Sequence, residues 1–153
     1  MYQIHLLGQF SVVHAGQGLT QPNHPRLQEL LAYLVLHPDR SISRQQLAFL
    51  FWPDSSEQQA RTNLRNLLYR LRRAFPACEE FMHRDETCLR WHQDARVKID
   101  AIDFQAAAGQ AATTQGLAQR EQLELSVKLY GGDLLPGCYS DWLLAERERL
   151  RTL

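Results

Sequence analysis

Long apolar runs are missing from this 153-residue chain, and no segment is apolar over enough residues to span a bilayer. The first residues, Met1–His5, also lack the basic stretch and apolar core of a secretory signal. Both absences argue against a membrane protein or a secreted one. We therefore expect the protein to work in the cytoplasm, without membrane contact.

Cysteine is scarce, and the motifs of metal and catalytic sites are absent. Three cysteines at irregular spacing argue against a disulfide framework, and none forms a Cys-x-x-Cys pair for zinc. The six histidines are scattered, and there is no Gly-rich phosphate loop, nucleophile elbow or pair of catalytic carboxylates. The sequence thus predicts a protein that is not an enzyme and holds no metal or cofactor.

An overall excess of one charge is absent too, since 17 basic residues balance 17 acidic ones. Their distribution is uneven. Residues 1–98 contain 12 basic and 9 acidic residues (net +3), whereas residues 99–153 contain 5 and 8 (net −3). Between Glu57 and Phe75 lie five arginines and one glutamate, a net charge of +4. This concentration is typical of a surface that binds a polyanion, and equally of a solvated helix face.

What the sequence does contain is a two-faced helical pattern over Glu57–Phe75. Apolar residues recur there at helical spacing, which predicts a buried stripe. The stripe is formed by Ala60, Leu64, Leu67, Leu68, Leu71 and Phe75. The opposite face carries Arg, Asn, Thr and Tyr, the side chains that reach phosphates and base edges in a DNA groove. Its members are Thr62, Arg65, Asn66, Tyr69 and Arg73, flanked by Arg61, Arg70 and Arg72.

The surrounding patterns predict an α+β fold. Strand-like runs at Tyr2–Leu7, Phe10–His14 and Leu19–Gln21, with Ala15–Gly18 as a break, indicate a small N-terminal antiparallel sheet. Helical patterns follow at 26–37 and at 44–51, with a very short strand at 41–42 between them. Ser43 is a predicted N-cap of the second helix, and Ser55 or Ser56 of the helix after it.

A predicted hairpin comes directly after the basic helix. Its strands are 80–83 and 88–92, and the turn is Arg84–Thr87. Helix, turn, helix and hairpin is the chain order of a winged helix. We expect this domain to occupy residues 1–98.

Residues 99–153 read as helical. We expect helices at 102–113, at 117–129 and from Trp142 to the end, with a connector at Gly131–Gly137. Helical hairpins of this size usually need stacked neighbours to close their core. Because the last helix has no cap, this second domain is expected to be the truncated start of a longer helical region.

Several of these segments resemble those of SARP-type bacterial transcriptional activators. The first block, in the winged-helix part, comprises Val35–Pro38, Ile42–Leu47, Leu50–Asp54, Ala60–Arg65 and Leu71–Pro76. The second block is similar to the start of the bacterial transcriptional activator domain and comprises Tyr130–Gly137, Asp141-Trp142 and Glu146–Leu150. The resemblance covers nearly the whole chain.

The resemblance implies an OmpR-type winged helix with three helices and a C-terminal wing, followed by a tetratricopeptide-like helical hairpin region. In that family the third helix enters the major groove of double-stranded DNA. Members commonly bind direct repeats in tandem and recruit RNA polymerase. For this chain the resemblance therefore implies a bacterial activator, nucleoid-associated when bound, with RNA polymerase and a second copy on DNA as further partners.

Carried onto this sequence, the resemblance assigns two sets of DNA-binding residues. Base readout would fall to Thr62, Arg65, Asn66, Tyr69 and Arg73. Phosphate contacts would come from Ser43, Arg44, Arg61, Arg72 and Arg84. The wing departs from the family pattern, because Arg84–Thr87 has no glycine and two acids where the family's turn is usually Gly-containing and basic. Acidic residues there repel phosphate.

Two functions remain open at this point. One is sequence-specific DNA binding for transcriptional regulation, with Glu57–Phe75 as the recognition helix. The other is a winged helix with helical repeats that serves mainly for protein–protein interaction in a larger signalling protein. The balanced net charge and the acidic wing are the observations that support the second function.

Overall fold

The computed structural model describes residues 2–14, 17–19, 24–138 and 140–153. The chain forms two compact units, Met1–Leu19 with Ala95–Leu153, and Thr20–Asp94. The boundary expected between residues 98 and 99 lies inside the first unit. The division into domains 1–98 and 99–153 stays a prediction.

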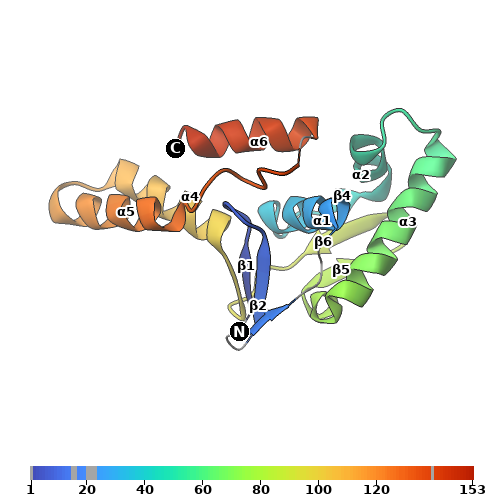
Figure 1. Cartoon of the computed structure of the whole chain (residues 1–153), viewed down its shortest axis with the longest axis horizontal. Coiled ribbons are helices and arrows are strands. Elements are labelled where there is room, and N and C mark those ends of the chain that lie inside the picture. Colours follow the sequence, from blue (N-terminus) through green and yellow to red (C-terminus); the bar gives the residue numbers. More distant parts are fainter. Residues whose placement is uncertain (1, 15–16, 20–23, 139) are drawn as a thin grey trace. The chain divides into compact units, whose positions relative to one another are not determined.

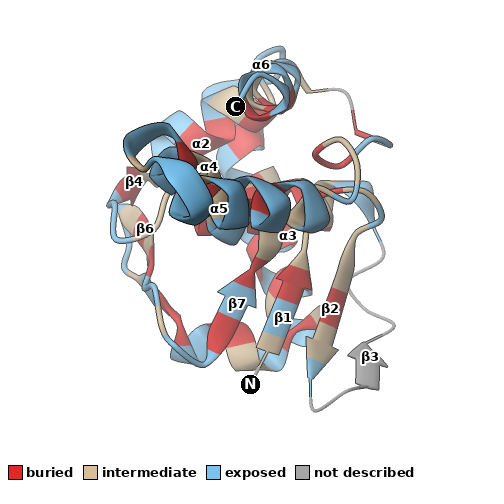
Figure 2. Ribbon diagram, turned by 90° about the vertical axis from the view of Figure 1, so that its left-hand side faces the viewer, coloured by how far each residue is buried: buried red, intermediate tan, exposed pale blue. Residues whose placement is uncertain are grey.

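The first unit contains a four-stranded sheet in the order β3-β2-β1-β7. Figure 2 shows β2, β1 and β7 side by side. Its strands are β1 (Tyr2–His5), β2 (Ser11–His14), β3 (Gln17–Leu19) and β7 (Val97–Ile99). The first three are antiparallel neighbours, as expected, but β7 was not expected and runs parallel to β1. The third strand begins earlier than expected, inside the predicted break, while Thr20 and Gln21 lie outside the described residues.

Asp100 joins this sheet to the helices. Its carboxylate accepts hydrogen bonds from the backbone amides of Leu6 (2.8 Å), Leu7 (3.0 Å) and Ala101 (2.7 Å). Burial raises the pKa of Asp100, and the three amides oppose that shift. One side chain therefore satisfies donors at the end of β1 and at the start of a helix.

Three helices complete this unit: α4 (Asp100–Thr113), α5 (Gly116–Leu129) and α6 (Asp141–Arg151). Most of α5 is exposed, as Figure 2 shows. The last helix was expected to continue to the end of the chain, which is wrong. It ends at Arg151, because the backbone N–H of Thr152 turns back to the carbonyls of Glu148 and Leu150.

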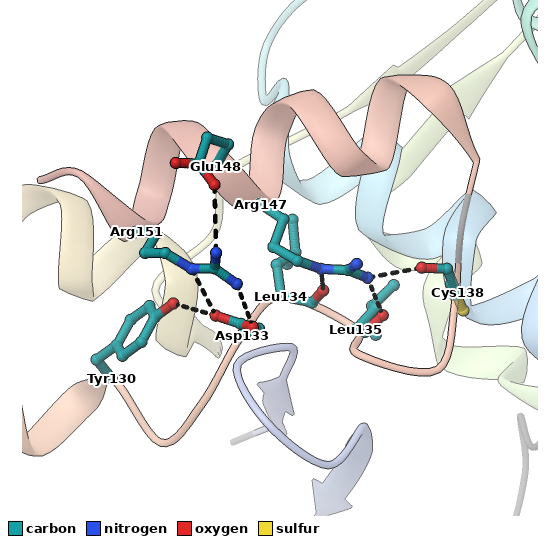
Figure 3. Close-up of polar contacts among 8 residues, drawn as sticks. All are labelled: Tyr130, Asp133, Leu134, Leu135, Cys138, Arg147, Glu148 and Arg151. Carbon is teal, nitrogen blue, oxygen red and sulfur yellow. Dashed lines mark hydrogen bonds and ion pairs between the residues drawn. The ribbon is translucent and has the colours of Figure 1, made fainter.

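The connector before α6 is organised by Arg147 (Figure 3). The buried guanidinium donates to the backbone carbonyls of Leu134 (2.8 Å), Leu135 (2.5 Å) and Cys138 (2.6 Å). The connector also pairs with the sheet, since the amide of Leu135 donates to the carbonyl of Leu6 (3.0 Å). The conspicuous Gly131–Gly137 motif is thus a structural element of this unit.

The second unit holds the three helices and the hairpin of a winged helix (Figure 1). The helices are α1 (Pro25–Leu36), α2 (Arg44–Phe51) and α3 (Glu57–Ala74), followed by a 3-10 turn, η1 (Pro76–Glu80). The strands β4 (Ile42–Ser43), β5 (Met82–Arg84) and β6 (Cys88–Trp91) form a sheet in the order β4-β6-β5. The expected α+β fold class is confirmed.

Local sequence signals set the ends of these helices. Ser43 Oγ accepts from the amide of Gln46 (3.3 Å), and Ser56 Oγ accepts from the amide of Gln59 (3.1 Å), so both are N-caps. The whole predicted stripe of α3 is buried. In α2 the apolar residues Leu47, Ala48 and Phe51 are buried, whereas Leu50 is only half-buried.

Candidate nucleic-acid interface

The polar face of α3 lies in solvent. All five side chains predicted to read bases are exposed, with Tyr69 at 53%. Arg65 and Asn66 make no side-chain hydrogen bond or ion pair with any part of the chain that the structure describes. Both are therefore free to form the bidentate contacts that guanine and adenine offer in a major groove.

The other three residues of this face have partners within the helix. Thr62 Oγ1 donates to the carbonyl of Gln58 (3.1 Å). Arg73 donates to the hydroxyl of Tyr69 (3.2 Å), and its guanidinium carbon lies 5.8 Å from the centre of the tyrosine ring. A DNA contact by Arg73 or Tyr69 would have to keep or replace this mutual contact.

A hollow of about 310 Å³ lies beside this face and is rich in arginine. Three elements surround it: the start of α2, the first half of α3 and the turn of the wing. Its lining residues are Ser43, Arg44, Gln45, Arg61, Leu64, Arg65, Glu86 and Thr87. The fold thus brings three predicted phosphate ligands, Ser43, Arg44 and Arg61, together with Arg65.

Arg44 shows how crowded the cations are. Its pKa is lowered, first by partial burial and then by repulsion from Arg84, Arg65 and Arg72, while Asp85 opposes the shift. A guanidinium stays protonated at any ordinary pH. The repulsion therefore marks a concentrated positive field, in which an anion would be favoured.

Most of the predicted phosphate ligands already have a carboxylate partner. Arg61 pairs with Glu57 (2.9 Å). Arg72 and Arg84 both pair with Glu79, and both contact the same oxygen, Oε1, at 3.5 Å and 3.2 Å. The structure therefore brings Arg72 and Arg84 together, through an acid to which sequence reasoning assigned no role.

The wing turn does without glycine because Asp85 organises it. One oxygen of its carboxylate accepts from the amides of Thr87 (2.8 Å) and Cys88 (2.7 Å) and from the hydroxyl of Thr87 (3.1 Å). These bonds lower the pKa of Asp85. The turn is fixed to α2 as well, since the amide of Arg44 donates to the carbonyl of Thr87 (2.9 Å).

Sequence reasoning therefore missed the roles of Glu79, Asp85 and Glu86. The Asp-x-Thr spacing of the turn is a signal for Asp85, because Asp side chains commonly bond to their own backbone two residues later. For Glu79 and Glu86 the linear sequence holds no such signal, since their positions depend on how α2, α3 and the wing assemble.

Two observations concern other kinds of site. Among the residues that the structure describes, no group of three or more His, Cys, Asp or Glu side chains could hold a metal ion. In the same residues, no helix has the length and apolar character needed to cross a membrane.

Three helices followed by a β-hairpin, with a basic third helix, define a winged-helix protein. Residues 22–84 match the family model described as "Transcriptional regulatory protein, C terminal". Residues 22–84 are thus similar to a family of OmpR-type winged-helix DNA-binding domains of transcriptional regulators. The match supports DNA binding in transcription regulation.

A solved structure extends the likeness to the whole chain. It is described as Mycobacterium tuberculosis EmbR in complex with a low affinity phosphopeptide. The match has a TM-score of 0.70 at 16% sequence identity, and it covers 99% of this chain but 40% of that one. At this identity the likeness shows the fold alone. A comparison with curated proteins finds no match. The family and fold findings bear out the resemblance seen in the sequence.

Proposed function

We propose that the protein binds a specific sequence of double-stranded DNA, with α3 as the major-groove recognition helix, and that it activates transcription. The observation that carries the proposal is the free pair Arg65 and Asn66 on the exposed face of α3, beside the arginine-rich hollow. With 18 residues, α3 is about 27 Å long and can lie along a groove roughly 12 Å wide.

Within this proposal the two sets of residues have separate roles. Thr62, Arg65 and Asn66 contact bases, together with Tyr69 and Arg73. The backbone contacts come from Ser43, Arg44, Arg61, Arg72 and Arg84. Phosphate contacts fix the register of a protein on the duplex, whereas base contacts select the sequence.

The further steps rest on the family resemblance. They are the recruitment of RNA polymerase, the binding of two copies to direct repeats, and location on the chromosome in a bacterial cytoplasm.

The large exposure of Val127 (75%) and Leu117 (71%) on α5 favours a second function, protein–protein interaction through the helical region. Whether the purified protein binds DNA decides which of the two functions is the main role of the winged helix.

The first experiment is a binding selection on genomic DNA fragments, followed by sequencing and by a titration on the recovered site. We expect Arg65→Ala to weaken binding to that site by about 1–3 kcal/mol and to relax base choice at one position. The matched variant is Arg61→Ala, from the same helix. It should weaken binding to all duplexes alike and lower the salt slope by about 0.9 for a lost phosphate contact.

The two variants distinguish base-specific contacts from electrostatic contacts with the phosphates. If Arg65→Ala weakened all duplexes equally, Arg65 would be a backbone ligand and the assigned readout would be wrong. If the wild-type protein retained no DNA even at low ionic strength, the DNA-reading proposal would fail and the interaction function would replace it.

A further inference from the structure

The arginine cluster of the second unit consists of Arg44, Arg61, Arg65, Arg72 and Arg84. Besides Glu57, which pairs with Arg61, and Asp85, which organises the wing turn, two further carboxylates stand within it. Glu79 lies between the last turn of α3 and the end of β5, where its Oε1 contacts Arg72 Nη1 at 3.5 Å and Arg84 Nη2 at 3.2 Å. One oxygen between two guanidinium groups is the arrangement that a phosphate oxygen takes when two arginines hold it.

Glu86 stands at the other end of the cluster. It lines the arginine-rich hollow with Arg44, Arg61 and Arg65, and it is exposed. Unlike its neighbour Asp85, it makes no hydrogen bond or ion pair within the part of the chain that the structure describes. Its charge therefore serves no turn or cap, yet it lies in the same field that would attract a phosphate.

We propose that Glu79 and Glu86 are internal counterions that compete with DNA phosphates for the arginine cluster, and so weaken the sequence-independent part of DNA binding. This inference rests on the proposed function. Sequence-independent affinity comes almost wholly from contacts between basic side chains and phosphates. A phosphate that reaches Arg72 and Arg84 must displace Glu79, and one that enters the hollow meets the charge of Glu86. Arg65 and Asn66 are left to supply a larger share of the affinity for the correct sequence.

A positioning role for Glu79 predicts the opposite result. If the carboxylate served to hold Arg72 and Arg84 ready for a phosphate, its removal would weaken DNA binding. If it competes, its removal strengthens binding. The sign of a single measurement therefore distinguishes the two roles.

The experiment measures the affinity of the whole chain for a short duplex of random sequence, over a series of salt concentrations. We expect Glu79→Gln and Glu86→Gln each to bind about two- to fivefold more tightly at low salt, and the gain to shrink as salt screens the charges. The control is Glu121→Gln on α5, an exposed acid that lies outside the cluster and removes the same charge. Its gain should be smaller. Thermal unfolding verifies that each variant is folded. If Glu79→Gln is not folded, the inference is tested with Glu86→Gln alone.

The outcomes are separable. If the wild-type protein binds the duplex and neither variant exceeds Glu121→Gln, the counterion inference fails while the proposed function stands. Weaker binding by Glu79→Gln also overturns it, in favour of positioning. If neither the wild type nor the variants bind, the proposed function fails and the inference fails with it. Binding by the variants beyond the control supports both.

Discussion

Asp85 and Glu86 are neighbouring acids at the wing turn, yet the structure uses only one of them. Asp85 accepts three hydrogen bonds from Thr87 and Cys88, whereas Glu86 accepts none within the described residues. Counting acids in the sequence treats the two as equal sources of repulsion. The structure separates them, because the charge of Asp85 is partly offset by its donors while that of Glu86 is not.

The role of Asp85 gives a pH-dependent prediction. Because the pKa of Asp85 is lowered below its ordinary 3.8, the folded protein binds that proton less readily than the unfolded chain does. The order that Asp85 gives to the wing turn is fully present above the unfolded pKa, and it is lost as the pH falls through the lower folded pKa. An NMR titration should therefore find the Asp85 carboxyl titrating below 3.8.

The matched variants are Asp85→Ala and Glu86→Gln. Asp85→Ala should speed hydrogen exchange at the amides of Thr87 and Cys88, because both lose their acceptor. Glu86→Gln should leave those rates unchanged. An ordinary titration of Asp85, or equal exchange in both variants, would contradict the assigned turn.

The elements that carried long periodic signals were predictable, and those that depended on distant partners were not. In the part of the chain that the structure describes, the six α-helices were all expected near their observed positions, because stripes such as Leu64, Leu67, Leu68 and Leu71 repeat over several turns. The strand β7 was missed, since Val97–Ile99 is too short for a periodic signal and its partner β1 lies at the other end of the chain.

The candidate site divides in the same way. The exposed face of α3 follows from helical spacing alone, so the exposure of Arg65 and Asn66 was predictable. The contact of Glu79 with Arg72 and Arg84 was not, because it joins α3, η1 and β5 through side chains whose meeting depends on the fold. The roles of these residues toward DNA stay predictions.

The connector before α6 depends on Arg147 more than on its glycines. Three backbone carbonyls accept from this one buried guanidinium (Figure 3). Arg147→Met keeps much of the side-chain volume but leaves those carbonyls without their charged donor. We expect the free energy of unfolding to fall by roughly 3 kcal/mol, measured by denaturant titration.

Arg151→Met is the matched control, four residues later on the same helix. Arg151 pairs with Asp133, but its side chain is 51% exposed and water can replace the pair. Its loss should destabilise the protein much less than that of Arg147. Equal losses from the two variants would mean that the carbonyl contacts of Arg147 contribute little.

The start of the chain pairs with segments from its second half in one unit, because β1 pairs with β7, and Leu6 and Leu7, just after β1, pair with the connector at Leu134-Leu135. The candidate DNA-binding surface lies wholly in the other unit, Thr20–Asp94. This partition predicts that damage to the first unit spreads within it before it reaches α3 and the wing. Asp100 is the residue with which to test this, since it joins β1 to the start of α4.

Asp100→Ala removes the acceptor of three backbone amides, those of Leu6, Leu7 and Ala101. We expect a loss of about 2–3 kcal/mol in the stability of the first unit, because buried donors are left unpaired. Hydrogen exchange should accelerate at Leu6 and Leu7 while α3 and the wing keep their protection, and DNA affinity should change little. The stability of Asp100→Asn, which retains an acceptor oxygen, should lie between that of Asp100→Ala and that of the wild type. If protection fell equally in α3, the two units would unfold as one cooperative body, and the helices after residue 95 would contribute directly to the stability of the DNA-binding surface.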